Sequence, residues 1–273
     1  MTVLVTGATG NVGRPLVAQL LAAGHRVRAL TRNPATAGLP EGTEVVAGNL
    51  AVTATLPAAF AGVSAAHLIS FGDDYAPLAN ATEIVDAAVA AGVRKVTVLK
   101  GDLDKTPLDE AVAAGGMDFT YLEPVEFMSN VLEWAESVRQ EGVVRDGFPT
   151  VPSSMVHDAD IASVAAAVLT GDGHSGKEYP LTGPEALTAP EKAAVLADVL
   201  GRDVRFVELG RDEMIARWRA EGYSDDDIDF FVMVRTNPPE AGRTVLPTVE
   251  QVTGRPARTF AQWVRENAAA FGG

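Results

Sequence analysis

The chain of 273 residues contains no cysteine. Disulfides, thiolate nucleophiles and cysteine-ligated metals are therefore excluded. A serine hydrolase is not expected either, because Ser153 and Ser154 lack the Gly-x-Ser-x-Gly elbow. The histidines are His25, His67, His157 and His174. They are too scattered along the chain for a metal-ligand pattern, so the sequence predicts no metal site.

Positive charge is also scarce, because 22 Lys and Arg face 36 Asp and Glu and leave a net charge of −14. Nucleic-acid phosphates would be repelled over most of the surface, so we expect no nucleic-acid partner. No apolar run approaches the ~20 residues needed to cross a bilayer. Met1 leads directly into the first predicted strand, with no room for a signal peptide. We expect a soluble, cytoplasmic protein without a membrane partner, and no feature indicates an oligomeric state.

Glycine, in contrast, is placed with regularity near the start of the chain. Three glycines spaced by two residues occur in Val3-Leu4-Val5-Thr6-Gly7-Ala8-Thr9-Gly10-Asn11-Val12-Gly13-Arg14-Pro15. Such a turn lets backbone N–H groups approach a pyrophosphate and places that anion at a positive helix N-terminus. Gly7 would form the tight turn, Gly10 would allow the close approach, and Gly13 would pack the helix on the strand. We interpret the segment as a dinucleotide site; the alternative is an ordinary glycine-rich turn.

The residues after the second predicted strand indicate which dinucleotide binds. An NAD-binding chain usually offers Asp or Glu to the ribose 2′-hydroxyl about 20 residues beyond the glycines. Here the strand over residues 26–30 is followed by Thr31, Arg32, Asn33 and Pro34. The Arg32 guanidinium can clamp a 2′-phosphate, which predicts NADP(H), unless Arg32 is a solvated loop cation. Arg14 could add a second positive charge near that phosphate or point into solvent.

Strand and helix patterns alternate through the first half of the chain. Predicted strands span residues 2–5, 26–30, 44–47, 65–70, 95–99 and 119–122. Predicted helices span residues 14–23, 56–60, 79–91, 107–114 and 125–141. This alternation predicts an α/β fold with a doubly wound parallel Rossmann sheet. We expect residues 1–142 to form an NADP-binding Rossmann domain.

Strand and helix patterns no longer alternate regularly in residues 143–273. A helix over 158–169 and a strand over 178–181 are expected to return to the main sheet, so that about 156–183 belongs to it. Further helices are predicted from the Thr188 cap to residue 200 and over 212–220, 225–234 and 260–271. The C-terminal part is therefore expected to form a small, mostly helical cap that binds a substrate or a partner.

Ligands of such sheets bind beyond the carboxyl ends of the strands. This rule selects the candidate cofactor-binding residues from the glycine turn and from the ends of the other strands. They are Gly7, Thr9, Gly10, Asn11, Val12, Gly13, Thr31, Arg32, Asn49, Leu50, Ser70, Phe71, Lys100 and Pro124.

Several segments together resemble the NmrA-like family of atypical short-chain dehydrogenase/reductases. The resemblance is carried by residues 5–13, 27–34, 46–50, 93–96, 117–124 and 127–128, and later by 158–162 and 179–184. It covers about the first 200 residues and implies an NAD(P)-binding Rossmann fold. Asn49 departs from the family, which usually has an Asp that contacts the adenine. Leu99-Lys100-Gly101-Asp102 replaces a segment that is usually rich in serine.

The carbonyl-reduction pair of conventional superfamily members, a Tyr with a Lys four residues later, is missing. The tyrosines are Tyr75, Tyr121, Tyr179 and Tyr223, and none has Lys at that spacing. Tyr121 lies in a predicted core strand and is expected to pack there. The helix over 107–114 offers only Asp109 and Glu110. The resemblance implies a group that includes reductases of quinones and dyes as well as catalytically silent NADP sensors.

Two residues remain as candidate catalytic groups. Lys100 ends the fifth strand, where its ammonium could orient the ribose or stabilise a developing oxyanion. The alternative is a solvated loop lysine. Tyr75 follows the fourth strand and could protonate a substrate if its loop folds over the site.

These observations favour an NADPH-dependent oxidoreductase that transfers hydride to a hydrophobic, conjugated small molecule such as a quinone, an enone or a polycyclic ketone. An acceptor with delocalised charge needs less acid catalysis, which makes the missing Tyr–Lys pair tolerable. The acid would be solvent, Lys100 or the substrate's own hydroxyl. Two alternatives remain: a non-enzymatic NADP-binding regulator, and a non-redox cyclase or isomerase that keeps the cofactor as a scaffold.

Overall fold

The computed structural model describes residues 1–72, 76–101 and 104–273. The chain divides into two compact units. The first unit comprises residues 1–124, 158–181 and 251–254, and the second comprises 125–157, 182–250 and 255–273. The longest segment of the first unit therefore ends at Pro124, whereas the sequence predicts the end of the Rossmann domain at residue 142.

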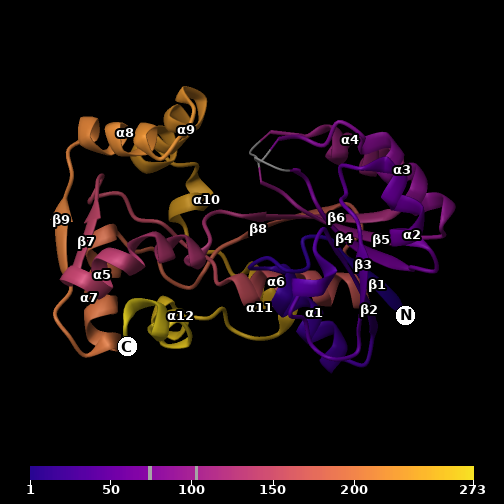
Figure 1. Ribbon diagram of the computed structural model, residues 1–273, viewed down its shortest axis with the longest axis horizontal. Helices are drawn as coiled ribbons and strands as arrows, with labels where there is room; N and C mark the ends of the chain where they lie inside the picture. The colour runs from indigo at the N-terminus through magenta and orange to yellow at the C-terminus, as the bar shows by residue number, and fades with distance from the viewer. Residues whose placement is uncertain (73–75, 102–103) are drawn as a thin grey trace. The chain divides into compact units, whose positions relative to one another are not determined.

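A parallel seven-stranded sheet forms the centre of the first unit (Figure 1). Its strands are β1 (Thr2–Val5), β2 (Arg26–Thr31), β3 (Thr43–Ala47), β4 (Ala65–Ile69), β5 (Lys95–Leu99), β6 (Asp118–Pro124) and β8 (Lys177–Leu181). Their order in the sheet is β3-β2-β1-β4-β5-β6-β8. The chain thus adopts the predicted doubly wound Rossmann fold. The strand order reverses between β1 and β4, the position where such sheets bind dinucleotides.

Helices cover both faces of this sheet. They are α1 (Gly13–Ala22), α2 (Leu56–Phe60), α3 (Ala81–Ala90), α4 (Pro107–Ala114) and α6 (Asp158–Thr170), with 3₁₀ turns η1 (Pro34–Thr36) and η2 (Thr53–Thr55). Figure 1 shows α2, α3 and α4 on one face and α1 and α6 on the other. Helix α3 buries Ile84, Val85 and Ala88 against the sheet core. Burial of such apolar faces from water is the main force that holds the layers together.

The second unit has its own core and a small sheet of its own. Strands β7 (Val143–Asp146) and β9 (Arg205–Glu208) pair in parallel. Its helical elements are η4 (Met128–Trp134), α5 (Ala135–Glu141), α7 (Ala189–Leu200), α8 (Arg211–Ala220), α9 (Asp225–Thr236), α10 (Glu240–Arg243), α12 (Phe260–Glu266) and η5 (Ala268–Phe271), while α11 (Thr248–Thr253) contributes to both units. Trp134, Leu196 and Trp263 are buried in its core.

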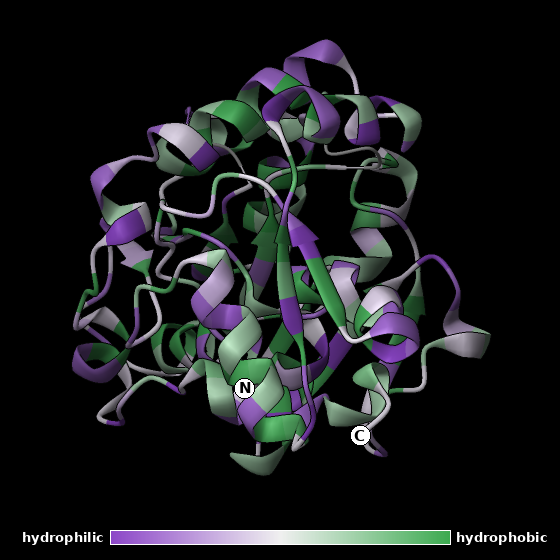
Figure 2. Cartoon of the chain, turned by 90° about the vertical axis from the view of Figure 1, so that its left-hand side faces the viewer, coloured by the Kyte–Doolittle hydropathy of each residue, from purple (hydrophilic) through white to green (hydrophobic). Residues whose placement is uncertain are grey.

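The hydropathy of the chain fits this packing. Many helices in Figure 2 carry both hydrophilic and hydrophobic bands, as amphipathic helices do. Among the described residues, no helix is long and apolar enough to cross a membrane.

The prediction of one helix over residues 125–141 is wrong. Phe127 is extended instead, because the Val156 N–H donates to the Glu126 carbonyl at 2.8 Å and the Met128 N–H donates to the Val156 carbonyl at 3.0 Å. A 3₁₀ segment, η4, and the short helix α5 follow. Hydrogen bonds to a distant segment therefore override the local helical pattern.

Candidate cofactor-binding site

The glycine turn connects β1 to α1 as the sequence predicts. Gly7 has a φ of +58°, a left-handed conformation that favours glycine. The Gly10 N–H donates to the Gly7 carbonyl at 2.9 Å and closes the turn. A Cβ atom at Gly13 would lie only 2.1 Å from the Gly7 carbonyl oxygen and 2.7 Å from the Ala8 Cα. Only glycine therefore lets the helix start this close to the strand.

The start of α1 is also open to an anion. Among the described residues, no side chain caps the helix at Val12, and its first turn contains no acidic residue. A carboxylate there would compete with a bound phosphate for the positive end of the helix dipole. A Cβ at Gly10 would lie 3.2 Å from the Gly7 carbonyl oxygen, so the turn is tight around its glycines. The cradle and the dipole fit the pyrophosphate of a dinucleotide.

The ends of β2 and β3 are held together next to this turn. The Gly48 N–H donates to the Thr31 carbonyl at 3.0 Å, and a Cβ at Gly48 would lie 2.7 Å from a Leu30 methyl carbon. The Asn49 side-chain oxygen accepts from the Ala51 N–H at 3.0 Å. An Asp could accept this same bond, so the departure from the family preserves the loop. Arg32 is exposed at the end of β2.

Hydrogen bonds join the ends of β4 and β5 as well. The Ser70 hydroxyl is buried and accepts from the Gly101 N–H at 3.2 Å. A Cβ at Gly101 would lie 2.5 Å from two carbons of the Phe71 ring. The ring therefore lies directly against the glycine backbone. This contact has no local sequence signal, because it depends on two strands that are adjacent only in the folded sheet.

Lys100 is not a solvated loop lysine. Its side chain is only 8% exposed, and its Nζ lies 3.5 Å from Oε1 of Glu123, the penultimate residue of β6. The same nitrogen lies 5.9 Å from the centroid of the Tyr121 ring. A buried ammonium needs such partners, because its desolvation is costly when it is unpaired. Glu123 follows the predicted strand over 119–122, so the sequence already predicts it at this edge. Its pairing with Lys100 has no local sequence signal, since the pair forms across neighbouring strands.

Tyr121 packs in the core, as the sequence predicts. Its side chain is buried, and its hydroxyl donates to the Asp109 backbone carbonyl at 2.7 Å. Burial raises the pKa of Tyr121 to about 12, with further contributions from Asp109 and Glu178. The phenol thus stays protonated near neutral pH and is committed to a structural bond. The Asp109 carboxylate in turn accepts from Thr106 and caps α4.

Tyr75, the other candidate catalytic residue, lies outside the described residues. His67, in the middle of β4, is fully buried, and its Nδ1 lies 2.8 Å from the Thr97 hydroxyl on β5. Burial lowers the pKa of His67 to about 4, so the ring is neutral at physiological pH. It is a core residue.

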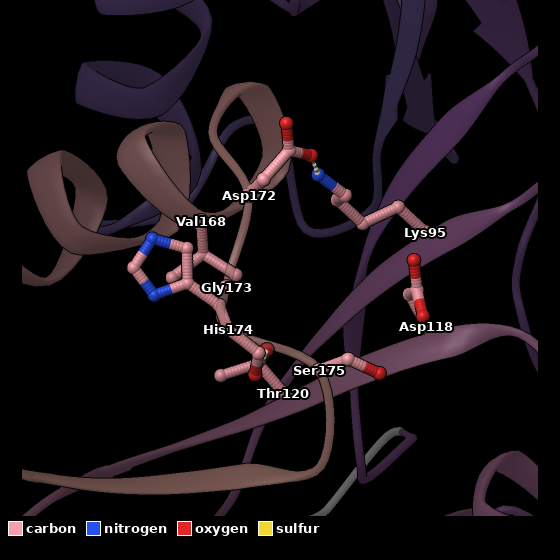
Figure 3. Close-up of a pocket in the computed structure, with 8 residues that line it drawn as sticks. All are labelled: Lys95, Asp118, Thr120, Val168, Asp172, Gly173, His174 and Ser175. Atoms are coloured by element: carbon pink, nitrogen blue, oxygen red, sulfur yellow. Dashed lines mark hydrogen bonds and ion pairs between the residues drawn. The ribbon is translucent and has the colours of Figure 1, made fainter.

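A small cavity lies at the opposite, amino-terminal edge of the sheet (Figure 3). It is lined by Lys95, Asp118, Thr120, Val168, Asp172, Gly173, His174 and Ser175. Lys95 and Asp118 are the first residues of β5 and β6. The Lys95 ammonium contacts the Gly171 carbonyl and lies 3.3 Å from a carboxylate oxygen of Asp172. This cavity is therefore separate from the candidate cofactor site at the carboxyl edge.

Taken together, the strand order and the glycine turn define a Rossmann-fold protein with a turn of the dinucleotide-binding kind. The model of the NmrA-like family matches residues 1–218, and the chain belongs to that family. The family predicted from the sequence is thereby confirmed.

Two curated relatives align over nearly the whole chain. A (4-alkanoyl-5-oxo-2,5-dihydrofuran-3-yl)methyl phosphate reductase of Streptomyces griseus is 39% identical over 98% of this chain and 99% of its own. An NAD(P)H azoreductase of Xenophilus azovorans is 34% identical over 99% of both chains.

Solved structures share the fold. The NADPH-dependent quinone oxidoreductase of Escherichia coli, complexed with NADPH, is 25% identical, covers 97% of this chain and 99% of its own, and superposes with a TM-score of 0.81. The triphenylmethane reductase of a Citrobacter species is 22% identical over the whole of both chains, with a TM-score of 0.79. At that identity the second likeness concerns the fold alone.

Proposed function

We propose that this chain is an NADPH-dependent oxidoreductase that transfers a hydride to a hydrophobic, conjugated small molecule such as a quinone, an enone or a polycyclic ketone. The glycine turn carries the proposal. Gly7 and Gly13 bring the uncapped start of α1 to the end of β1, at the reversal point of the sheet. Two of the relatives that align over nearly the full length are named as a reductase and as an NAD(P)H azoreductase.

Different residues at the carboxyl edge of the sheet would bind different parts of the cofactor. The glycine turn would hold the pyrophosphate, and Arg32 would bind the ribose 2′-phosphate through charged hydrogen bonds. Asn49 and Leu50 would face the adenine side. Ser70, Phe71, Lys100 and Pro124 follow or end β4, β5 and β6 and would line the nicotinamide side. NADPH, when bound there, supplies the hydride.

The substrate class follows from what the named relatives share chemically. An alkanoyl dihydrofuranone, an azo compound and a quinone are all conjugated acceptors that delocalise the charge they gain. Such acceptors need little acid catalysis. This suits a chain in which no tyrosine is followed by Lys after four residues.

Lys100 is the residue we propose for charge stabilisation. Its ammonium is buried at the end of β5 and held by Glu123, so it is fixed in position before any substrate binds. A fixed cation in a poorly solvated site stabilises developing negative charge more than a solvated one does. Tyr75 is the second candidate, as a proton donor from the loop after β4.

A direct assay tests the proposal. The protein is incubated with NADPH and a panel of quinones, azo dyes and unsaturated lactones while the absorbance of NADPH is followed. We expect catalysed NADPH oxidation with at least one conjugated acceptor, and much less with isolated ketones of the same size. Tight NADPH binding without turnover on any acceptor would favour the regulator or the non-redox enzyme instead.

A further inference from the structure

Arg14 connects the two loops that bracket the expected position of the ribose. Its Nε donates to the Thr9 carbonyl in the glycine turn at 2.9 Å. One terminal nitrogen of the same guanidinium donates to the Gly38 carbonyl, also at 2.9 Å. Gly38 lies in the loop that follows β2, the loop that begins near Arg32. The sequence left open whether Arg14 points into solvent, and the structure places its guanidinium between these loops.

The positive charge of Arg14 has no anionic counterpart within the described part of the chain. Both of its partners are backbone carbonyls, and no carboxylate among the described residues lies within ion-pair distance. Some described arginines are neutralised, since Arg28 pairs with Glu44 at 2.9 Å and Arg219 with Asp225 at 3.0 Å. Arg139 and Arg202, like Arg14, donate to backbone carbonyls instead. What sets Arg14 apart is its position between the glycine turn and the loop after β2.

Arg14 is exposed and held by two carbonyl oxygens, so its charge is only mildly disfavoured at this end of the helix. Arg14 is the second residue of α1, and a cation in the first turn of a helix is repelled by the positive end of the dipole. A bound anion would be attracted both by the positive end of the helix and by the guanidinium, and these two attractions would offset the repulsion between them. The helix start and the guanidinium therefore point to the same kind of ligand.

We propose that Arg14 is a second cation of the 2′-phosphate site and a determinant of the preference for NADPH over NADH. The inference rests on the proposed function. A phosphomonoester carries about −1.5 to −2 charges near neutral pH, whereas NADH has an uncharged hydroxyl at the same position. A charge that acts on the 2′-phosphate must discriminate between the two cofactors. A residue that only ties the loops together would affect both cofactors alike.

The test measures dissociation constants of NADPH and NADH by fluorescence, with no turnover involved. Arg14→Gln removes the charge and keeps a donor at the position of Nε for the Thr9 carbonyl, while the bond to the Gly38 carbonyl is lost. Loss of that loop contact alone would affect both cofactors alike. We expect the affinity of this variant for NADPH to fall on the order of tenfold to a hundredfold, with NADH affinity nearly unchanged. Arg32→Ala should act in the same direction, and the matched control Arg94→Met removes a charge from an exposed position before β5, so it should change neither constant.

Equal losses for the two cofactors, or no loss for either, would overturn the inference and leave Arg14 as a loop tether or a bystander. If Arg14→Gln does not fold, as judged by circular dichroism and thermal melting, Arg14→Lys is measured instead. Because Lys keeps the charge, it should retain most of the NADPH preference; loss of the whole preference would contradict a role for the charge. A wild-type chain that binds no NADPH would overturn the proposed function itself, which separates the two failures.

Discussion

At the scale of single residues, Lys100 is the side chain whose environment says most about the chemistry. It is 8% exposed, paired with Glu123, and lies at the strand end that would face the nicotinamide. The sequence predicts that Lys100 lies at the carboxyl edge of the sheet but leaves open whether its ammonium is solvated. The answer depends on the register of β5 and β6, in which Leu99 pairs with Leu122 and brings the following residues together. Sequence spacing alone does not reveal such a cross-strand pair.

Substitution of this lysine separates its possible roles. Lys100→Met should lower kcat by on the order of tenfold to a thousandfold, because one positioned donor to a developing oxyanion is lost. NADPH affinity should change little, since an interaction made mainly in the transition state appears in the rate. Steady-state kinetics with NADPH titrations measure both quantities. An unchanged kcat would remove the catalytic assignment, and a loss confined to NADPH affinity would make Lys100 a ribose-binding residue.

At the scale of elements, the glycine turn shows how much of the fold and site can be predicted. Strand β1 and the glycine turn were predicted because their signals are local: an apolar run, and three glycines spaced by two residues, of which Gly7 has a positive φ. The helix over 125–141 failed because residues 126–128 hydrogen-bond to Val156. Strands β7 and β9 were missed for a related reason. Each has four residues, and each forms only through its pairing with the other.

The close contact between the glycine turn and the start of α1 can be tested by adding a Cβ atom at Gly13. Gly13→Ala would place a Cβ 2.1 Å from the Gly7 carbonyl oxygen, so the start of α1 must shift. We expect a loss of about 1–3 kcal/mol in the free energy of unfolding, the usual cost of overpacking, together with weaker NADPH binding. Urea denaturation and cofactor titration measure the two effects.

Gly210→Ala is the matched control. An added Cβ there meets nothing within 4 Å, and its φ of −65° suits any residue. Because Gly210 is the N-cap of α8, where Ala is less favourable than Gly, the control should cost less than about 1 kcal/mol of stability and leave binding unchanged. A Gly13→Ala protein as stable as the Gly210→Ala protein, with normal NADPH affinity, would contradict the close-packing role of this glycine.

At the scale of the whole molecule, the net charge of −14 contrasts with a cofactor that is itself anionic. Long-range attraction therefore does not bring NADPH to this protein; local groups must bind it. The start of α1, Arg32 and Arg14 are the local groups that the structure offers for this. The family and the fold were predictable from motifs in the first 200 residues. The substrate was predictable only as a class, because the second unit has no comparable motif.

The most direct measurement follows the hydride itself. The protein is supplied with NADPH that carries deuterium at both positions of the nicotinamide C4 and with an unsaturated lactone as acceptor, and the product is examined by mass spectrometry. Hydride transfer to carbon predicts a reduced product that carries one deuterium, formed together with an equal amount of NADP⁺. Reduced product without deuterium, or converted acceptor with no NADP⁺ formed, would contradict the proposal that this chain is an NADPH-dependent oxidoreductase.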